Sequence, residues 1–202
     1  MAKVKIQGHA SGTGILTVTA PNTSTDRTIT LPDATGSLLT SADIVETNLT
    51  ATSNIGLGAN AVDSITTGDY NVGVGDNALT ATTTGSENVA LGDNALDANV
   101  TGANNTAIGR NALTTSTVNN NTAVGWNSLQ ATTTGTNNTG LGLRSLYTNT
   151  TGAGNTALGR DALYANTTAA NNTGVGYNAL AANTTGTGHT AVGSIVGLNN
   201  AK

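Results

Sequence analysis

Residues 155–171 read Asn-Thr-Ala-Leu-Gly-Arg-Asp-Ala-Leu-Tyr-Ala-Asn-Thr-Thr-Ala-Ala-Asn, and variants of this stretch recur along most of the chain. The clearest feature is a glycine that follows an aliphatic residue, here called the marker glycine. Successive marker glycines lie seventeen positions apart, with one step of sixteen. They are Gly58, Gly75, Gly92, Gly109, Gly125, Gly142, Gly159, Gly176 and Gly193. A fixed period of this kind is typical of stacked repeat architectures.

Two apolar features keep a fixed distance from each marker glycine. An aliphatic residue directly precedes it, and the position two residues earlier is aliphatic in three copies and threonine from Thr106 onward. In the first eight copies a leucine comes four residues after the glycine, with a valine in its place in the first copy. The alternation is typical of a short strand with both residues on one face. The Asn/Thr/Gly stretch between these features is typical of turns.

A coil of strands and turns fits this pattern better than a helix, because glycine, asparagine and threonine are poor helix formers. Seventeen residues give about 56 Å of path, enough for one coil with two or three short strands. About nine coils stacked ~4.8 Å apart would span on the order of 43 Å. The sequence therefore predicts an all-β, parallel β-roll or β-solenoid. In it, the pre-glycine aliphatics and the leucines form two buried ladders.

A third ladder is predicted from the residue four positions before each marker glycine. It consists of Asn54, Asn71, Asn88, Asn105, Asn121, Asn138, Asn155 and Asn172, with His189 in the last copy. An asparagine side chain can hydrogen-bond the backbone at a turn. The marker glycine itself is expected to permit a sharp or left-handed bend.

The composition excludes several classes of protein. The 202 residues contain 40 Thr and 27 Asn, only 9% charged residues and no cysteine, with a net charge of −4. Disulfides, thiolate metal sites and cysteine nucleophiles are therefore excluded, and we expect neither an enzyme nor a bound cofactor. The acidic balance argues against nucleic acid as a partner. No apolar run is long enough to insert into a membrane, and the N-terminus is too short and polar for a secretory leader.

Each coil offers only three or four small or medium apolar side chains for burial, which is little against the entropy of ordering the whole coil. Stacking offsets part of this cost. Sharing the core among chains would offset more. We therefore expect an oligomer, most simply a homotrimer around a long axis.

The chain is predicted to have four parts. Residues 1–40 form a small β module with strands at 4–6, 15–19 and 27–31, and its loop 21–26 closes a hairpin. Residues 41–53 are a connector in which Ser41 begins a short helix. Residues 54–198 are the repeat domain, and residues 199–202 are a tail.

Two resemblances attach to these residues. The stretch 155–168 resembles the head repeats of trimeric autotransporter adhesins, which implies a parallel β-roll that trimerises and binds host surfaces. The family's head repeats are shorter than the repeat of this chain. Residues 12–39, Gly-Thr-Gly-Ile-Leu-Thr-Val-Thr-Ala-Pro-Asn-Thr-Ser-Thr-Asp-Arg-Thr-Ile-Thr-Leu-Pro-Asp-Ala-Thr-Gly-Ser-Leu-Leu, are similar to a segment of phage tail fibre and virion appendage proteins, notably of cyanophages.

Together the resemblances imply a structural fibre on a phage virion, attached to its tail or capsid. The N-terminal module would dock on other virion proteins, and the repeats would contribute to host attachment. A trimeric bacterial adhesin head fragment is the second interpretation. An ice-binding β-solenoid is the third, because such proteins use regular threonine arrays.

The position after the marker glycine varies most, which indicates an outward face. Aromatic and arginine side chains are frequent at binding hot spots, so one hypothesis is a receptor or glycan face. Its candidate residues are Arg110, Trp126, Arg144, Tyr147, Arg160, Tyr164 and Tyr177. Plain solvent exposure is the alternative for all of them.

Other candidate sites are weaker. The early copies hold Asp63, Asp69, Asp76, Glu87, Asp93 and Asp97 without a basic residue among them. Calcium prefers several convergent oxygens, and these carboxylates are scattered. The Gly-x-Gly pairs belong to the repeat and do not match a dinucleotide fingerprint. His9 and His189 are too far apart in sequence to suggest a metal pair.

Overall fold

The computed structural model describes residues 17–18, 29–30 and 53–197. The chain divides into two compact units, Met1–Thr40 and Ser41–Lys202. In the first unit, β1 (Thr17–Val18) pairs antiparallel with β2 (Ile29–Thr30). Both strands lie within stretches predicted as strands, at 15–19 and 27–31. The predicted strand 4–6, the helix beginning at Ser41 and the tail 199–202 lie outside the described residues.

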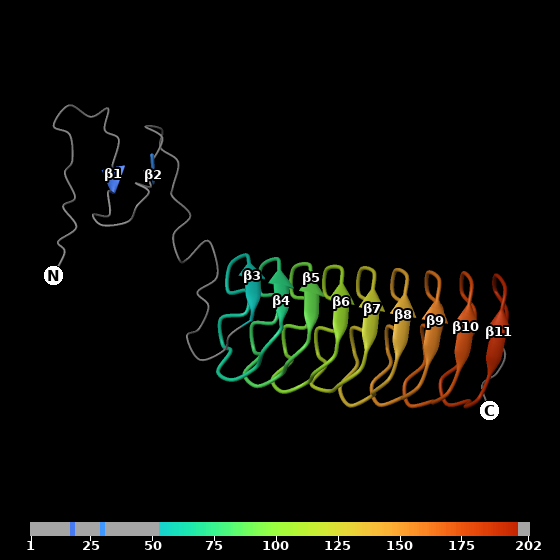
Figure 1. Ribbon diagram of the computed structural model, residues 1–202. Coiled ribbons are helices and arrows are strands. Elements are labelled where there is room, and N and C mark those ends of the chain that lie inside the picture. Colours follow the sequence, from blue (N-terminus) through green and yellow to red (C-terminus); the bar gives the residue numbers. More distant parts are fainter. Residues whose placement is uncertain (1–16, 19–28, 31–52, 198–202) are drawn as a thin grey trace. The chain divides into compact units, whose positions relative to one another are not determined.

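The repeat unit is a parallel β-solenoid, as predicted. Its described residues form one nine-stranded sheet in which every strand pairs with the strand of the next coil (Figure 1). Equivalent residues of successive copies are partners, for example Val124 with Leu141 and Leu141 with Leu158. The strands are β3 (Ile55–Leu57), β4 (Val72–Val74), β5 (Val89–Leu91), β6 (Thr106–Ile108), β7 (Thr122–Val124), β8 (Thr139–Leu141), β9 (Thr156–Leu158), β10 (Thr173–Val175) and β11 (Thr190–Val192).

The length of the repeat leaves room for two or three short strands per coil and does not fix their number, and each described coil has one strand of three residues. Left-handed residues interrupt the rest of the coil. In one copy they are Asn120 (φ 62°), Asn127 (φ 55°) and Leu129 (φ 52°). Such residues cannot continue an extended strand. The turns are nonetheless held coil to coil, as where the Leu129 amide donates to the Ser145 carbonyl at 2.9 Å.

The marker glycines make the sharp bend predicted from the sequence. Their φ angles lie between 122° and 139°, a region open to glycine and strained for other residues. The stacking of the coils also leaves no room for a side chain at this position. A β-carbon at Gly142 would lie 2.5 Å from the carbonyl oxygen of Gly159 in the next coil. Both constraints explain why this position is glycine in every copy.

The leucine ladder forms the core, as predicted. Its side chains are fully buried from Leu79 to Leu180, and a ladder of alanine or serine one residue earlier is buried beside it. The middle residue of each strand also points inward and is always glycine or alanine. The interior is too narrow for a larger side chain at this position, since a β-carbon at Gly73 would lie 2.5 Å from Cγ2 of Val62.

The pre-glycine aliphatics, predicted to be buried, instead lie on the outer face of the sheet. Strand burial alternates so that only the middle residue is inside. Leu91, Ile108, Leu141 and Leu158 are each 37–42% exposed. The two residues predicted to share a face do share one. That face is outside because the small middle residue is the only one that fits against the leucine ladder.

The asparagine ladder is buried, and its side chains form hydrogen bonds that run along the solenoid. From Asn54 to Asn155, each amide Nδ2 donates to a carbonyl 13 or 14 residues ahead, as from Asn138 to Gly152 at 2.8 Å. Each Oδ1 accepts from the backbone amide of the next ladder residue, as from Asn155 to Asn138 at 3.0 Å. His189 ends the ladder by donating its amide to Oδ1 of Asn172.

Candidate functional site

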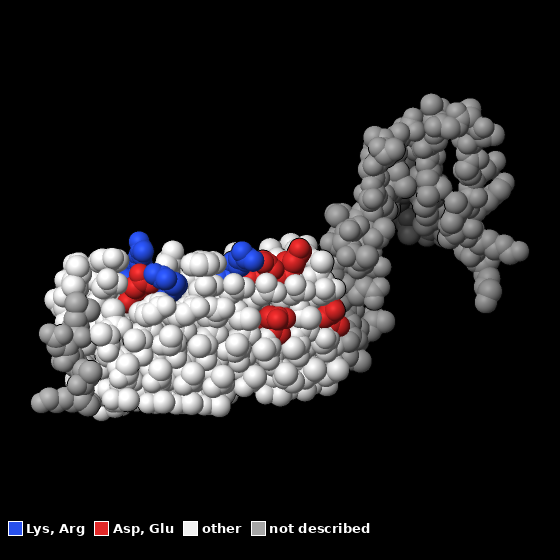
Figure 2. All heavy atoms as spheres, turned by 180° about the vertical axis from the view of Figure 1, so that it is seen from behind, with Lys and Arg blue, Asp and Glu red and all other residues white. Residues whose placement is uncertain are grey.

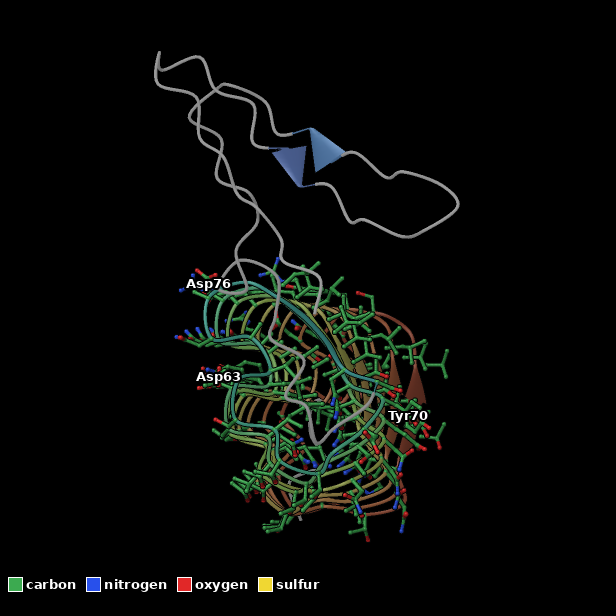
Figure 3. All side chains as sticks on the ribbon, turned by 60° about the vertical axis from the view of Figure 1, so that its left-hand side comes forward. Asp63, Tyr70 and Asp76 are labelled. Carbon is green, nitrogen blue, oxygen red and sulfur yellow. The ribbon has the colours of Figure 1, made fainter. Side chains whose placement is uncertain are left out.

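Three ladders of side chains follow the marker glycine on the side of the coil away from Tyr70 and the strands. In Figure 3, Asp76 marks the first position after the glycine and Asp63 marks the fifth. Both side chains point outward on the same side of the coil. The second position, between them, is asparagine from Asn60 to Asn127. These are the first, second and fifth ladders below, and they carry most of the described variation in side-chain chemistry.

The second ladder begins as a row of asparagines that bond each other. Asn60 donates to Asn77 at 3.0 Å, and the chain continues to Asn127. Arg144 and Asp161 then replace asparagine in two successive coils. Arg144 donates through Nε and Nη2 to the two carboxylate oxygens of Asp161, at 2.8 and 3.0 Å. The amide row thus becomes a bidentate ion pair, which is the stronger form of such contacts.

Arg160 of the first ladder joins this ion pair. Its Nε lies 3.1 Å from Oδ2 of Asp161. The Asp161 side chain is 10% exposed, whereas those of Arg144 and Arg160 are 33% and 59% exposed. The hydrogen bond from Arg144 to Asp161 raises the pKa of Arg144, and burial opposes the rise. Two guanidinium groups are therefore held by one carboxylate, and the cluster has a net positive charge.

The fifth ladder supplies aromatic rings to the same cluster. The rings of Tyr147 and Tyr164 stack with centroids 5.2 Å apart and planes 9° from parallel. The guanidinium carbon of Arg144 lies 5.2 Å from the Tyr164 centroid, and that of Arg160 lies 5.7 Å from the Tyr177 centroid. These distances are within the range of cation–π attraction. Five of the seven predicted face residues thus meet across three coils.

A shallow hollow opens beside this cluster. Its volume is about 180 Å³, and it is lined by Arg144, Asp161, Tyr164, Asn178 and Ala181. Ala181 is the fifth-ladder residue that follows Tyr147 and Tyr164. The hollow therefore lies where the tyrosine ladder ends, and it combines an aromatic wall with charged and amide groups.

The other two predicted face residues lie apart from this hollow. Arg110 pairs with Asp93 at 3.1 Å on an exposed surface. Trp126 is 47% exposed in the first ladder, two coils before Arg160. An exposed pair such as Arg110–Asp93 contributes little to stability. The Trp126 backbone carbonyl accepts a hydrogen bond from the Arg144 backbone amide at 3.0 Å, so Trp126 lies one coil before the cluster.

Sequence reasoning missed Asp161, Asn178 and Ala181 as members of the site. Asp161 could have been found, because it and Arg144 are opposite charges one repeat apart, at a position that is otherwise asparagine. Ala181 could not have been found from the sequence, because an alanine marks a site only when the stacking of the two preceding tyrosines is known.

The six acidic residues from Asp63 to Asp97 lie toward the N-terminal end of the repeat unit. Figure 2 shows acidic groups there, and a separate group of mixed charge toward the C-terminal end. Burial raises the pKa of Asp97, and the nearby charge of Asp93 raises it further. Within the described residues, no three His, Cys, Asp or Glu side chains are close enough to hold a metal ion.

The outer face of the sheet is a second candidate surface. The nine pre-glycine residues form a continuous row on it, here called the aliphatic stripe: Leu57, Val74, Leu91, Ile108, Val124, Leu141, Leu158, Val175 and Val192. Beside it run Ile55, Val72 and Val89 and then six threonines, Thr106 to Thr190. No strand from β3 to β11 contains a charged residue.

Comparison with known protein families, with curated proteins and with solved structures finds no match. Among the residues that the structure describes, no helix is long and apolar enough to cross a membrane.

Proposed function

We propose that this chain is a structural fibre subunit of a phage virion, and that three copies assemble through the outer faces of their sheets. The observation that carries the proposal is the aliphatic stripe. Single exposed apolar residues are ordinary on protein surfaces, but a continuous row along the whole solenoid indicates an interaction surface. The resemblance of residues 12–39 to virion appendage segments supports the phage assignment.

The repeat makes a second copy of the chain the natural partner for the stripe. The coil spacing is the same in every copy, so parallel chains in register bring aliphatic residues together at each level. The absence of charge from the strands suits a surface that is removed from water. Three stripes around one axis would form the shared core that the thin coils lack.

The first test is the solution mass of the full chain by light scattering. We expect about three times the chain mass of 19.9 kDa, stable on dilution. Leu141→Glu should shift the mass to that of a monomer, because it places a carboxylate on the stripe of each chain, and three carboxylates would meet near the axis.

Leu143→Glu is the matched control for this variant. Leu143 is 36% exposed and Leu141 is 38% exposed, but Leu143 lies in the first ladder, off the sheet. It should leave the mass unchanged. A monomeric parent chain, or equal dissociation by both variants, would contradict assembly through the sheet.

Ice binding is a second candidate, because the same outer face carries six threonines in register. The threonines of the turns are less suited to it, since hydroxyls such as those of Thr83, Thr133 and Thr150 donate to carbonyls of the next coil. Ice binding requires the sheet face to be free. A monomer with thermal hysteresis would therefore favour this candidate, and a trimer without it would favour the fibre.

Host attachment is the proposed role of the ladders on the other side of the coil. In a trimer assembled through the sheets, these ladders stay exposed to solvent. The same arrangement would serve a bacterial adhesin head, the remaining alternative. Binding of the purified trimer to cyanobacterial cells and to other bacterial or host cells would separate the two interpretations. Neither requires catalysis.

A further inference from the structure

The tyrosine ladder ends at an unfilled position. Tyr147 stacks on one face of Tyr164, and the guanidinium carbon of Arg144 lies 5.2 Å from the centroid of the same ring. Tyr164 lines the hollow together with the residue of the following coil. There the equivalent residue is Ala181, whose side chain is too short to cover a ring. The hollow of about 180 Å³ lies at this place. Coils are ~4.8 Å apart, so the open position has the depth of one stacked ring.

The hollow is lined by one positive and one negative group, Arg144 and Asp161, and a second guanidinium, Arg160, contacts Asp161 from outside the lining. Its nearest ionised groups are Arg144, Arg160 and Asp161, which together leave one net positive charge. Asp161 accepts one hydrogen bond from Arg160 and two from Arg144. A guanidinium group carries more N–H donors than these bonds use. The remaining donors are available to a ligand, and no further acidic residue is present after Asp161.

The groups around the hollow are held in place before any ligand arrives. The backbone amide of Asp161 donates to the Leu143 carbonyl at 2.9 Å, and that of Asn178 to the Arg160 carbonyl at 3.0 Å. The bidentate pair fixes the Arg144 guanidinium, and Tyr147 fixes the Tyr164 ring. Such preorganisation lowers the entropy lost on binding.

We propose that this hollow binds a pyranose ring that carries a carboxylate, such as a uronic acid unit of a surface polysaccharide. The ring would stack on Tyr164 over Ala181 as the next member of the ladder. The carboxylate would bind Arg160 and Arg144, and Asn178 would bond the ring hydroxyls. The hollow is smaller than a typical drug-sized pocket, so one sugar unit would enter and the rest of the chain would lie outside. The inference rests on the attachment role proposed above.

The test uses the full chain and two matched sugars, methyl glucuronide and methyl glucoside, followed by saturation-transfer NMR. We expect the glucuronide to bind in the millimolar range, and about tenfold more tightly than the glucoside, a difference of about 1.4 kcal/mol. Arg160→Gln should abolish the preference for the acid. Tyr164→Ala should weaken the binding of both sugars.

Ala181→Tyr provides the sharpest variant, because it extends the ladder and fills the hollow without removing any contact. It should abolish binding of both sugars. Thr114→Tyr is its control, since it places the same side chain in the same ladder four coils earlier, and binding should be unchanged. Binding that survives Ala181→Tyr, or equal affinity for the two sugars, overturns the proposal.

The result is separable from the assembly test. A trimer that binds neither sugar overturns this inference and leaves the fibre proposal standing. A monomer whose glucuronide binding is lost in Ala181→Tyr supports the inference while overturning the trimer. If free glucuronate binds as tightly as its methyl glycoside, the result supports recognition of the acidic ring. If inorganic phosphate displaces the sugar with equal affinity, the result overturns the inference.

Discussion

Asn138→Ala is expected to lower the free energy of unfolding by about 2 to 5 kcal/mol. Asn138 donates to the Gly152 carbonyl at 2.8 Å and accepts from the Asn155 amide at 3.0 Å. The substitution leaves the buried Asn155 backbone amide unpaired, which costs about 1 to 3 kcal/mol. It also removes the bond to the Gly152 carbonyl and the bond from Asn155 Nδ2, each worth about 0.5 to 1.5 kcal/mol. Gly152 keeps its second hydrogen bond, from Asn149 Nδ2 at 3.0 Å. Urea unfolding followed by circular dichroism, at one fixed chain concentration, measures the change.

Asn137→Gly is the control, one residue away on the surface. The Asn137 amide donates only to the Thr136 hydroxyl at 3.2 Å, and the backbone is left-handed with φ 58°. Glycine suits that conformation, and Gly154 already occupies the same position in the next coil. We expect a change below about 1 kcal/mol. Equal effects of the two variants would mean that the buried asparagines do not stabilise the stacking.

The constant period of the repeat was enough to predict the solenoid. Residues that recur at a constant spacing lie on top of one another when the coils stack. The buried leucine ladder and the hydrogen-bonded asparagine ladder therefore both follow from position in the repeat. The strand count does not follow. It depends on left-handed residues such as Leu129, and a leucine in a sequence does not indicate a positive φ.

The direction of the strand faces could not be read from alternation alone. A period of two says that Leu141 and Thr139 share a face, but it does not say whether that face is inside. The middle residue, Gly140, carried the missing information, because only a small side chain fits beside Ser128 and Leu129. Had that constraint been applied, the aliphatic residues would have been predicted outside and assigned to an interface.

The candidate site shows a related limit. Exposure of Trp126, Arg160 and Tyr177 follows from variability within a rigid repeat, and the structure has all three exposed. Their grouping does not follow, because it depends on which ladders turn to the same side of the coil. Residues one repeat apart become neighbours, so the tyrosine stack and the arginine–aspartate pair were both encoded in the sequence at that spacing.

Gly142→Ala is expected to lower the free energy of unfolding by more than about 3 kcal/mol. The backbone has φ 136°, where a β-carbon is strained, and the new carbon would lie 2.5 Å from the Gly159 carbonyl oxygen. Unlike a flexible side chain, that oxygen cannot move without shifting the next coil. Gly154→Asn is the tolerant control, because φ is 68° there and asparagine already occupies the equivalent position at Asn137 and Asn171.

Gly193→Ala separates the two costs. Its φ of 139° carries the same backbone strain, but no further coil of described residues stacks on it. A β-carbon there would meet only the Val196 side chain, at 3.3 Å. The difference in unfolding free energy between Gly142→Ala and Gly193→Ala therefore compares the contact with the next coil with the weaker contact to the Val196 side chain. We expect Gly142→Ala to be the more costly by at least about 1 kcal/mol. Equal losses would assign the whole cost to the bend, and the marker glycine would then be required by its own coil and not by its neighbour.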